Sequence, residues 1–115
     1  MKKVALFAFQ GELMCFIHVL LNALEMKKAG ADVKIVVEGA ATKLIGELRR
    51  ENNPMHGLYV DTKTQGLIDA VCKACSTKMQ AVADIEAEGL PFAGEMSGHP
   101  SMARYMDAGY EIFIF

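Results

Sequence analysis

The chain alternates between short apolar runs and longer segments in which apolar positions recur with helical spacing. Four of the helical segments close with a glycine, which accepts the left-handed backbone conformation that ends helices. A strand-like run follows each of these glycines: Gly30 before residues 33–37, Gly66 before 67–68, Gly89 before 90–93, and Gly109 before 110–115. With the opening run at residues 4–9, the pattern predicts the order strand, helix, strand, helix, helix, strand, helix, strand, helix, strand.

Helical segments that alternate with short runs of Val, Ile, Leu and Phe are typical of parallel strands joined by right-handed crossovers, with helices on both faces. The sequence therefore predicts an α/β fold, a three-layer α/β/α sandwich of about five mainly parallel strands. Its 115 residues fit a single domain that spans residues 1–115.

The first helical segment, from about residue 12 to residue 29, is apolar nearly all round. Such a helix is buried on more than one side. Because the sheet covers only one side, we expect the remaining apolar face to pack against another subunit. A composition that is 52% hydrophobic with 8 Met also gives more apolar surface than a small monomer usually hides. Self-association is therefore expected.

The charge pattern excludes some partners. A net charge of -2, with lysines and arginines scattered along the chain, gives no basic footprint for nucleic acid. Two lysines precede the first apolar run, but Gln10 to Glu12 interrupt it, and no later segment approaches the ~20 apolar residues of a membrane span. We expect a cytoplasmic protein with no membrane partner. Its three cysteines favour free thiols, metal ligands or reactive cysteines over structural disulfides.

In a parallel sheet, four loops share the carboxyl edge: residues 10–12, 38–43, 72–77 and 94–100. They carry most of the potentially reactive polar groups. The stretch 39–43 lacks the glycine spacing of phosphate-binding loops, so no cofactor is expected.

The candidate reactive groups at this edge are two cysteines. Cys72 ends the third strand and Cys75 follows in the turn before a helical segment. The helix amino terminus and the nearby Lys73 and Lys78 favour the thiolate, the species that attacks persulfides, disulfides and electrophiles. The alternative is that both cysteines are small buried apolar residues.

Glu12 and His99 are further candidates. Glu12 stands in the first turn of the first helix, where we expect it near Cys72 and able to hold or transfer a proton. His99 precedes Pro100, which suits the first position of a helix, so the histidine either caps that helix or serves as a proton shuttle or ligand. A mixed metal site of Cys72, Cys75 and His99 is an alternative that nothing in the spacing requires, and no metal is expected.

Three segments, residues 11–24, 71–76 and 96–101, carry a resemblance that spans the whole chain. With its buried first helix and the cysteine directly after the third strand, the chain resembles the DsrE/DsrF-like superfamily, which includes the sulfur-relay subunits of the Tus and Dsr systems. The resemblance implies a doubly wound, flavodoxin-like sheet, assembly into dimers, trimers or hexamers, and a cysteine that carries sulfane sulfur as a persulfide. That cysteine corresponds to Cys72, whereas Cys75 is not part of the relay pattern.

The sequence thus predicts a sulfur carrier or sulfurtransferase-like protein with a sulfur donor or acceptor protein as partner. Cys72 would accept sulfur, Cys75 would resolve or share it, and Glu12 and His99 would tune protonation. Two alternatives remain open: an oligomeric, non-enzymatic module that binds a small ligand or metal, and a redox protein that cycles a Cys72–Cys75 disulfide.

Overall fold

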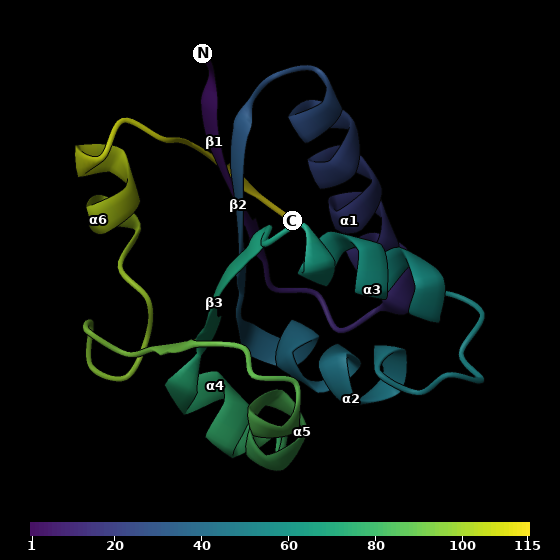
Figure 1. The fold of residues 1–115 in the computed structure, drawn as a ribbon. Helices are drawn as coiled ribbons and strands as arrows, with labels where there is room; N and C mark the ends of the chain where they lie inside the picture. The colour runs from purple at the N-terminus through teal and green to yellow at the C-terminus, as the bar shows by residue number, and fades with distance from the viewer.

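Five parallel strands form one sheet in the order β4-β3-β2-β1-β5, of which Figure 1 labels the central three. A computed structural model describes all residues 1–115. The strands are β1 (Lys3–Ala8), β2 (Asp32–Val37), β3 (Ile68–Cys72), β4 (Phe92–Ala93) and β5 (Glu111–Ile114). The predicted α/β fold with about five parallel strands is confirmed.

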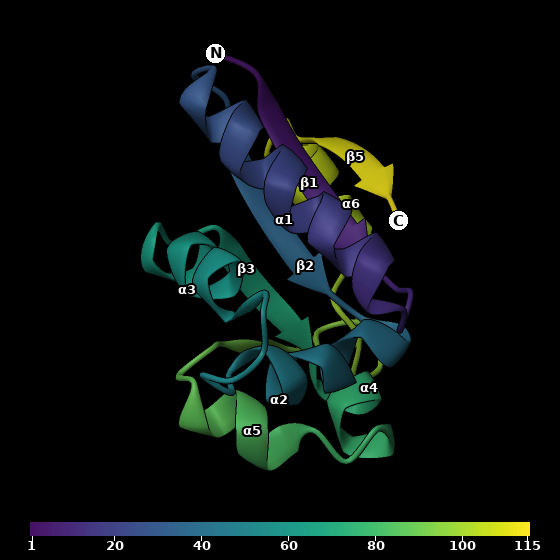
Figure 2. The same cartoon turned by 90° about the vertical axis from the view of Figure 1, so that its right-hand side faces the viewer.

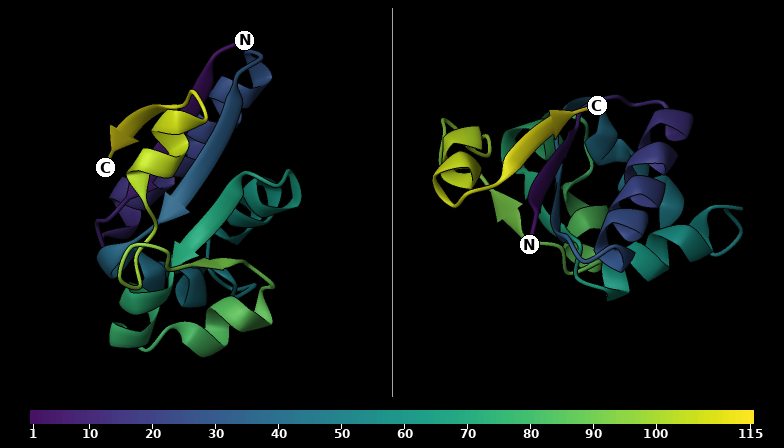
Figure 3. Two further views of the ribbon diagram at one scale, coloured as in Figure 1. Left: turned by 90° about the vertical axis from the view of Figure 1, so that its left-hand side faces the viewer. Right: turned by 90° about the horizontal axis from the view of Figure 1, so that it is seen from above.

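Helices cover both faces of the sheet, as Figure 3 shows from the edge. They are α1 (Leu13–Lys28), the 3₁₀ helix η1 (Gly39–Lys43), α2 (Leu44–Leu48), α3 (His56–Thr64), α4 (Lys73–Lys78), α5 (Val82–Ala87) and α6 (Met102–Asp107). Along the chain, β1, β2, β3 and β4 take successive places toward one edge of the sheet. Right-handed crossovers therefore place the helices that connect them on one face. The chain then returns to the far side of β1, which puts α6 on the opposite face. The result is the predicted three-layer, flavodoxin-like sandwich.

The two faces of the sheet bury very different amounts of apolar surface. Alternate residues of β1 point to opposite faces, so Leu6 belongs to a cluster of 21 buried residues and Phe7 to a cluster of five. On the smaller side, Phe7 packs edge-on against Tyr105 of α6, with ring centroids 5.4 Å apart. The face under α6 is therefore the thinner layer, and on β5 the side chains of Phe113 and Ile114 stay exposed.

Helix α1 lies across β1 and β2 (Figure 2). It buries Phe16, Val19 and Leu20, while Met14 is 73% exposed and Leu21 is 49% exposed. The helix that is apolar nearly all round thus leaves an apolar strip on the surface of a single chain. No helix combines the length and the apolar character needed to cross a membrane.

Several local elements differ from the sequence prediction. The helical segment after β3 divides at Gln80, whose φ of 57° ends α4 before α5 begins. Helix α6 begins at Met102, because Ser101 caps it by accepting a hydrogen bond from the Arg104 amide at 3.4 Å. The expectation that Pro100 opens this helix and that His99 caps it is wrong.

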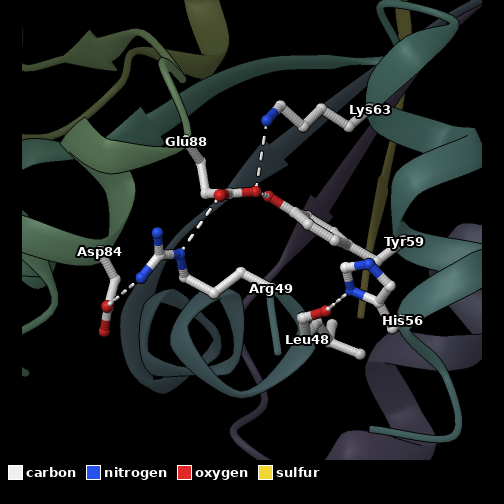
Figure 4. Close-up of polar contacts among 7 residues, drawn as sticks. All are labelled: Leu48, Arg49, His56, Tyr59, Lys63, Asp84 and Glu88. Carbon is white, nitrogen blue, oxygen red and sulfur yellow. Dashed lines mark hydrogen bonds and ion pairs between the residues drawn. The ribbon is translucent and has the colours of Figure 1, made fainter. Parts of the chain in front are cut away.

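A polar cluster joins α3, α5 and the end of α2 (Figure 4). The Glu88 carboxylate accepts hydrogen bonds from the Tyr59 hydroxyl at 2.6 Å, from Lys63 at 3.2 Å and from Arg49 at 3.2 Å. Arg49 also contacts Asp84 at 3.3 Å. Burial alone raises the pKa of the Glu88 carboxyl, but these donors outweigh burial and lower it below its usual value. Every charged or hydroxyl group of the cluster has a hydrogen-bond or ionic partner, so the cluster stabilises the packing of α5 against α2 and α3.

Candidate functional site

Four side chains that can bind a metal meet at the carboxyl edge of the sheet: Glu38, Cys72, Cys75 and His99. One ligand atom from each lies within 4.8 Å of the other three. Glu38 directly follows β2, Cys72 ends β3, Cys75 lies in the first turn of α4, and His99 follows β4. Because β3 lies between β2 and β4 in the sheet, their carboxyl ends bring Glu38 and His99 to either side of Cys72.

Cys72 is completely buried at the junction of strand and helix. Its extended backbone makes it the N-cap of α4, and its sulfur accepts a hydrogen bond from the Cys75 amide at 3.3 Å. The same sulfur lies 3.1 Å from Nδ1 of His99 and 3.7 Å from the carbonyl oxygen of Gly98. The structure therefore holds this sulfur in contact with three groups.

Burial raises the pKa of the Cys72 thiol to about 12, and the side chain of Cys75 and then the Glu38 carboxylate add to the increase. The hydrogen bond from the Cys75 amide acts in the opposite direction but is outweighed. Lys73 does not reach the sulfur, because its ammonium lies over the ring of Phe92, 4.4 Å from the centroid. At Cys72 burial thus outweighs the helix start, against the expectation that the helix start and the nearby lysines favour a thiolate.

Cys75 is the more accessible of the two thiols. It is partly exposed, and its sulfur lies 3.7 Å from Nδ1 of His99. The structure thus brings Cys72, Cys75 and His99 together, as three of the four site residues expected from the sequence.

A tight turn aims His99 at the two sulfurs. Met96 and His99 exchange two backbone hydrogen bonds, at 2.8 and 2.9 Å, around a two-residue turn. Ser97 and Gly98 at its centre have φ values of 50° and 94°, as a type I′ turn requires. The Gly98 carbonyl accepts the Ala74 amide at 2.9 Å, which ties the turn to α4. A Cβ on Gly98 would stand 3.1 Å from the Ala74 side chain, so glycine permits this close approach.

Glu38 is the residue that sequence reasoning missed as a site residue. The residue is 5% exposed, and its carboxyl oxygens, which make no hydrogen bond within the chain, reach the surface, because no buried side-chain oxygen of the chain lacks a hydrogen-bond partner. Burial raises the pKa of its carboxyl to about 7, and the charge of Glu95 adds to this. The available signal was an acidic residue directly after the apolar run of β2, in a loop expected at the same edge.

Glu12 does not join this group. It is exposed, and it precedes α1 as an N-cap residue whose side chain makes no capping hydrogen bond. It follows β1, and β2 separates β1 from β3. Two strand spacings amount to roughly 10 Å, more than the separation of the four clustered groups.

A hollow of about 320 Å³ adjoins the four groups on one side. Its walls are mostly apolar, and two of the four clustered side chains form part of them. The lining residues are Phe9, Glu38, Met96, His99, Pro100, Ser101, Met102 and Ala103.

The donor set is that of a tetrahedral zinc site: two sulfurs, one imidazole nitrogen and one carboxylate oxygen. Zinc bonds of about 2.0–2.3 Å place neighbouring ligand atoms about 3.3–3.8 Å apart. The distances from His99 to the two sulfurs, 3.1 and 3.7 Å, already fall close to that range. Small movements of the side chains would therefore complete the tetrahedron.

Comparison with known proteins finds relatives of the chain that are themselves uncharacterized. No family model matches the chain. The chain is 32% identical over 103 residues to the uncharacterized protein MJ0733 of Methanocaldococcus jannaschii, covering 90% of this chain and 82% of that protein. An uncharacterized protein of Archaeoglobus fulgidus is 46% identical over 37 residues, 32% of this chain. A solved structure of a conserved protein of unknown function, BT1422 from Bacteroides thetaiotaomicron, superposes with a TM-score of 0.75 and covers 99% of this chain and 95% of that protein's chain. The two sequences are 15% identical, so the likeness is one of fold alone.

Proposed function

This chain belongs to the same family as the uncharacterized protein MJ0733, and we propose that it is a metalloprotein holding one zinc ion between Glu38, Cys72, Cys75 and His99. The observation that supports the proposal is the convergence of four ligand atoms, from three separate segments, within 4.8 Å of one another.

The types of ligand favour zinc over magnesium or calcium. Thiolate sulfur and imidazole nitrogen suit zinc, whereas magnesium and calcium prefer an all-oxygen shell. A zinc ion displaces the protons of its cysteine ligands. The raised pKa of the Cys72 thiol therefore belongs to the metal-free protein, and it predicts that the affinity for zinc increases as pH rises. The Cys75 amide, which donates to the Cys72 sulfur, would support the bound thiolate.

Glu38 supports the same proposal. Its carboxylate makes no hydrogen bond or ion pair within the chain, and its oxygens still reach the surface at the hollow, so they are free to bind an ion. A divalent cation at the centre of the four groups would neutralise its charge and that of the cysteines.

Metal analysis of the purified, reduced protein tests the proposal. We expect equimolar zinc after reconstitution, and a loss of affinity in Cys72→Ala larger than the ~10–100-fold typical of losing a supporting residue. Competition with a chromophoric chelator measures the affinity. Cys15→Ser is the matched control, because Cys15 is a free, partly exposed thiol of α1 outside the cluster. A wild-type protein that binds no zinc, or a Cys72→Ala protein that binds it equally well, would contradict the proposal.

The second candidate is the sulfur carrier implied by the resemblance to DsrE/DsrF-like proteins. Its support is the place of Cys72 after β3 and the partly exposed Cys75 beside it. A persulfide donor would pass its outer sulfur to the protein thiol and leave as a thiol, so that a cysteine persulfide forms. Intact-mass analysis would then show a gain of one sulfur atom that disappears in Cys72→Ser. Equal uptake by that variant would refute a carrier role for Cys72, and zinc loading should suppress uptake because the same sulfurs would bind the ion.

A further inference from the structure

The wall of the hollow beside the four ligands is mostly apolar, and its polar lining residues are Ser101 and the two ligands Glu38 and His99. Phe9, Met96, Pro100, Met102 and Ala103 supply its apolar surface. Glu38 and His99 line it, whereas the two cysteines do not. A molecule in the hollow would therefore meet the zinc ion on the side of Glu38 and His99.

Of the four ligands, Glu38 is the least constrained. Cys72 is fixed as the N-cap of α4, Cys75 lies in its first turn, and His99 is held by the turn that Ser97 and Gly98 form. The Glu38 carboxyl has no hydrogen bond to hold it, and it is the only hard oxygen ligand in a set of soft donors. Two cysteines, one histidine and an exchangeable fourth position form the arrangement of a catalytic zinc ion.

The lining also restricts the ligand. It contains no lysine or arginine, so nothing would neutralise an anionic group on the ligand's tail. A volume of about 320 Å³ is at the lower end for ligand cavities, which fits a molecule about the size of one substituted ring. Sulfur is a donor atom that suits a zinc ion already bound by two thiolates, so the ligand is expected to bind through sulfur.

We propose that this hollow binds a small neutral thiol with an apolar tail, whose sulfur replaces the Glu38 carboxylate on the zinc ion. The inference rests on the proposed zinc site. In the exchange the sulfur–zinc bond forms, the Glu38 oxygen–zinc bond breaks, and the proton of the thiol passes to the buffer, with no change of oxidation state.

Cobalt substitution tests the exchange, because the visible bands of Co²⁺ report its ligands. Phenylmethanethiol should shift the bands of the cobalt-loaded protein saturably, and 2-mercaptoethanol should bind at least about tenfold more weakly because it lacks an apolar tail. Ala103→Trp, at an exposed position in the wall of the hollow, should keep the cobalt spectrum and weaken phenylmethanethiol binding at least about tenfold. Ala83→Trp, at an exposed position of α5, is the matched control and should leave binding unchanged.

The outcomes separate the two proposals. A cobalt spectrum that forms normally but does not respond to phenylmethanethiol overturns the thiol site and leaves the metal site standing. Equal binding of the two thiols, or equal binding to Ala103→Trp and wild type, places the thiol outside the hollow and overturns the inference as well. If no cobalt spectrum forms at all, the metal site fails and the thiol site fails with it.

Discussion

Glu38→Gln should remove a pH-dependent loss of stability from the metal-free protein. The carboxyl of this largely buried residue makes no hydrogen bond or ion pair within the chain, and burial raises its pKa from the ordinary value of 4.5 to about 7. The folded protein therefore favours the protonated carboxyl. Glutamine has nearly the same shape but cannot ionise, so the variant isolates the effect of this charge.

The sign and size of the effect follow from the two pKa values. A raised pKa in the folded state gives stability that is fully present below pH 4.5 and is lost as pH rises through about 7. Between about pH 5 and about pH 8, the free energy of unfolding of the wild type should fall by roughly 2 kcal/mol relative to that of Glu38→Gln.

Urea unfolding at the two pH values, with a chelator and a reducing agent present, measures this difference. Glu12→Gln is the control, because Glu12 is an exposed carboxylate near the same edge and should show no comparable pH effect. A difference between wild type and Glu38→Gln that does not change with pH would refute the account of a desolvated, unpartnered carboxyl. In saturating zinc the order should reverse, since the wild type alone keeps its fourth ligand.

Four further predictions concern the turn, the polar cluster, the thiols and the surface. Gly98→Ala should lower zinc affinity at least about tenfold in a chelator competition while circular dichroism stays native, because alanine is strained at φ 94°; unchanged affinity would show that the turn does not position the histidine. Tyr59→Phe should lower the free energy of unfolding by about 1.5–3 kcal/mol, because its hydroxyl donates to a carboxylate; chemical denaturation measures this, and a loss under 0.5 kcal/mol, about the size of an ordinary surface substitution, would contradict it. Iodoacetamide should modify Cys75 faster than Cys72 in the metal-free protein, as peptide mass analysis would show, because Cys72 is buried with a raised pKa; equal rates would contradict the burial. The expected self-association should weaken in Leu21→Glu, measured by sedimentation, and a monomeric wild type would refute it.

The fold was predictable because its signals are local and repeated. Helix-ending glycines and short apolar runs recur along the chain, and they indicate parallel strands without any knowledge of contacts. The prediction was less accurate for β4, because only Phe92 and Ala93 of the expected run 90–93 pair with β3. Its short pairing depends on the neighbouring strand, which a local pattern does not describe.

The candidate site was predictable only in part, because its membership depends on the order of the strands. Parallel strands put Glu12, Glu38, Cys72 and His99 at one edge, but the sequence does not say which loops are neighbours. In the observed order β4-β3-β2-β1-β5, the ends of β2 and β4 flank that of β3, and the end of β1 lies one strand further away. Glu38 therefore takes the place beside Cys72 that was expected for Glu12.

The ionisation of Cys72 depends on its surroundings in the same way. From the sequence, the helix start and nearby lysines favour a thiolate, but burial between β3 and the turn before His99 outweighs them. Within the chain Lys73 packs on Phe92, and the ionisable base in contact with the sulfur is His99, whose Nδ1 lies 3.1 Å away, so any further positive charge at the thiolate must come from outside the chain. The same burial that makes Cys72 a weak nucleophile on its own would make it a strong ligand once a divalent cation is present. The chemistry of this edge is therefore expected to depend on what occupies the space between the four groups.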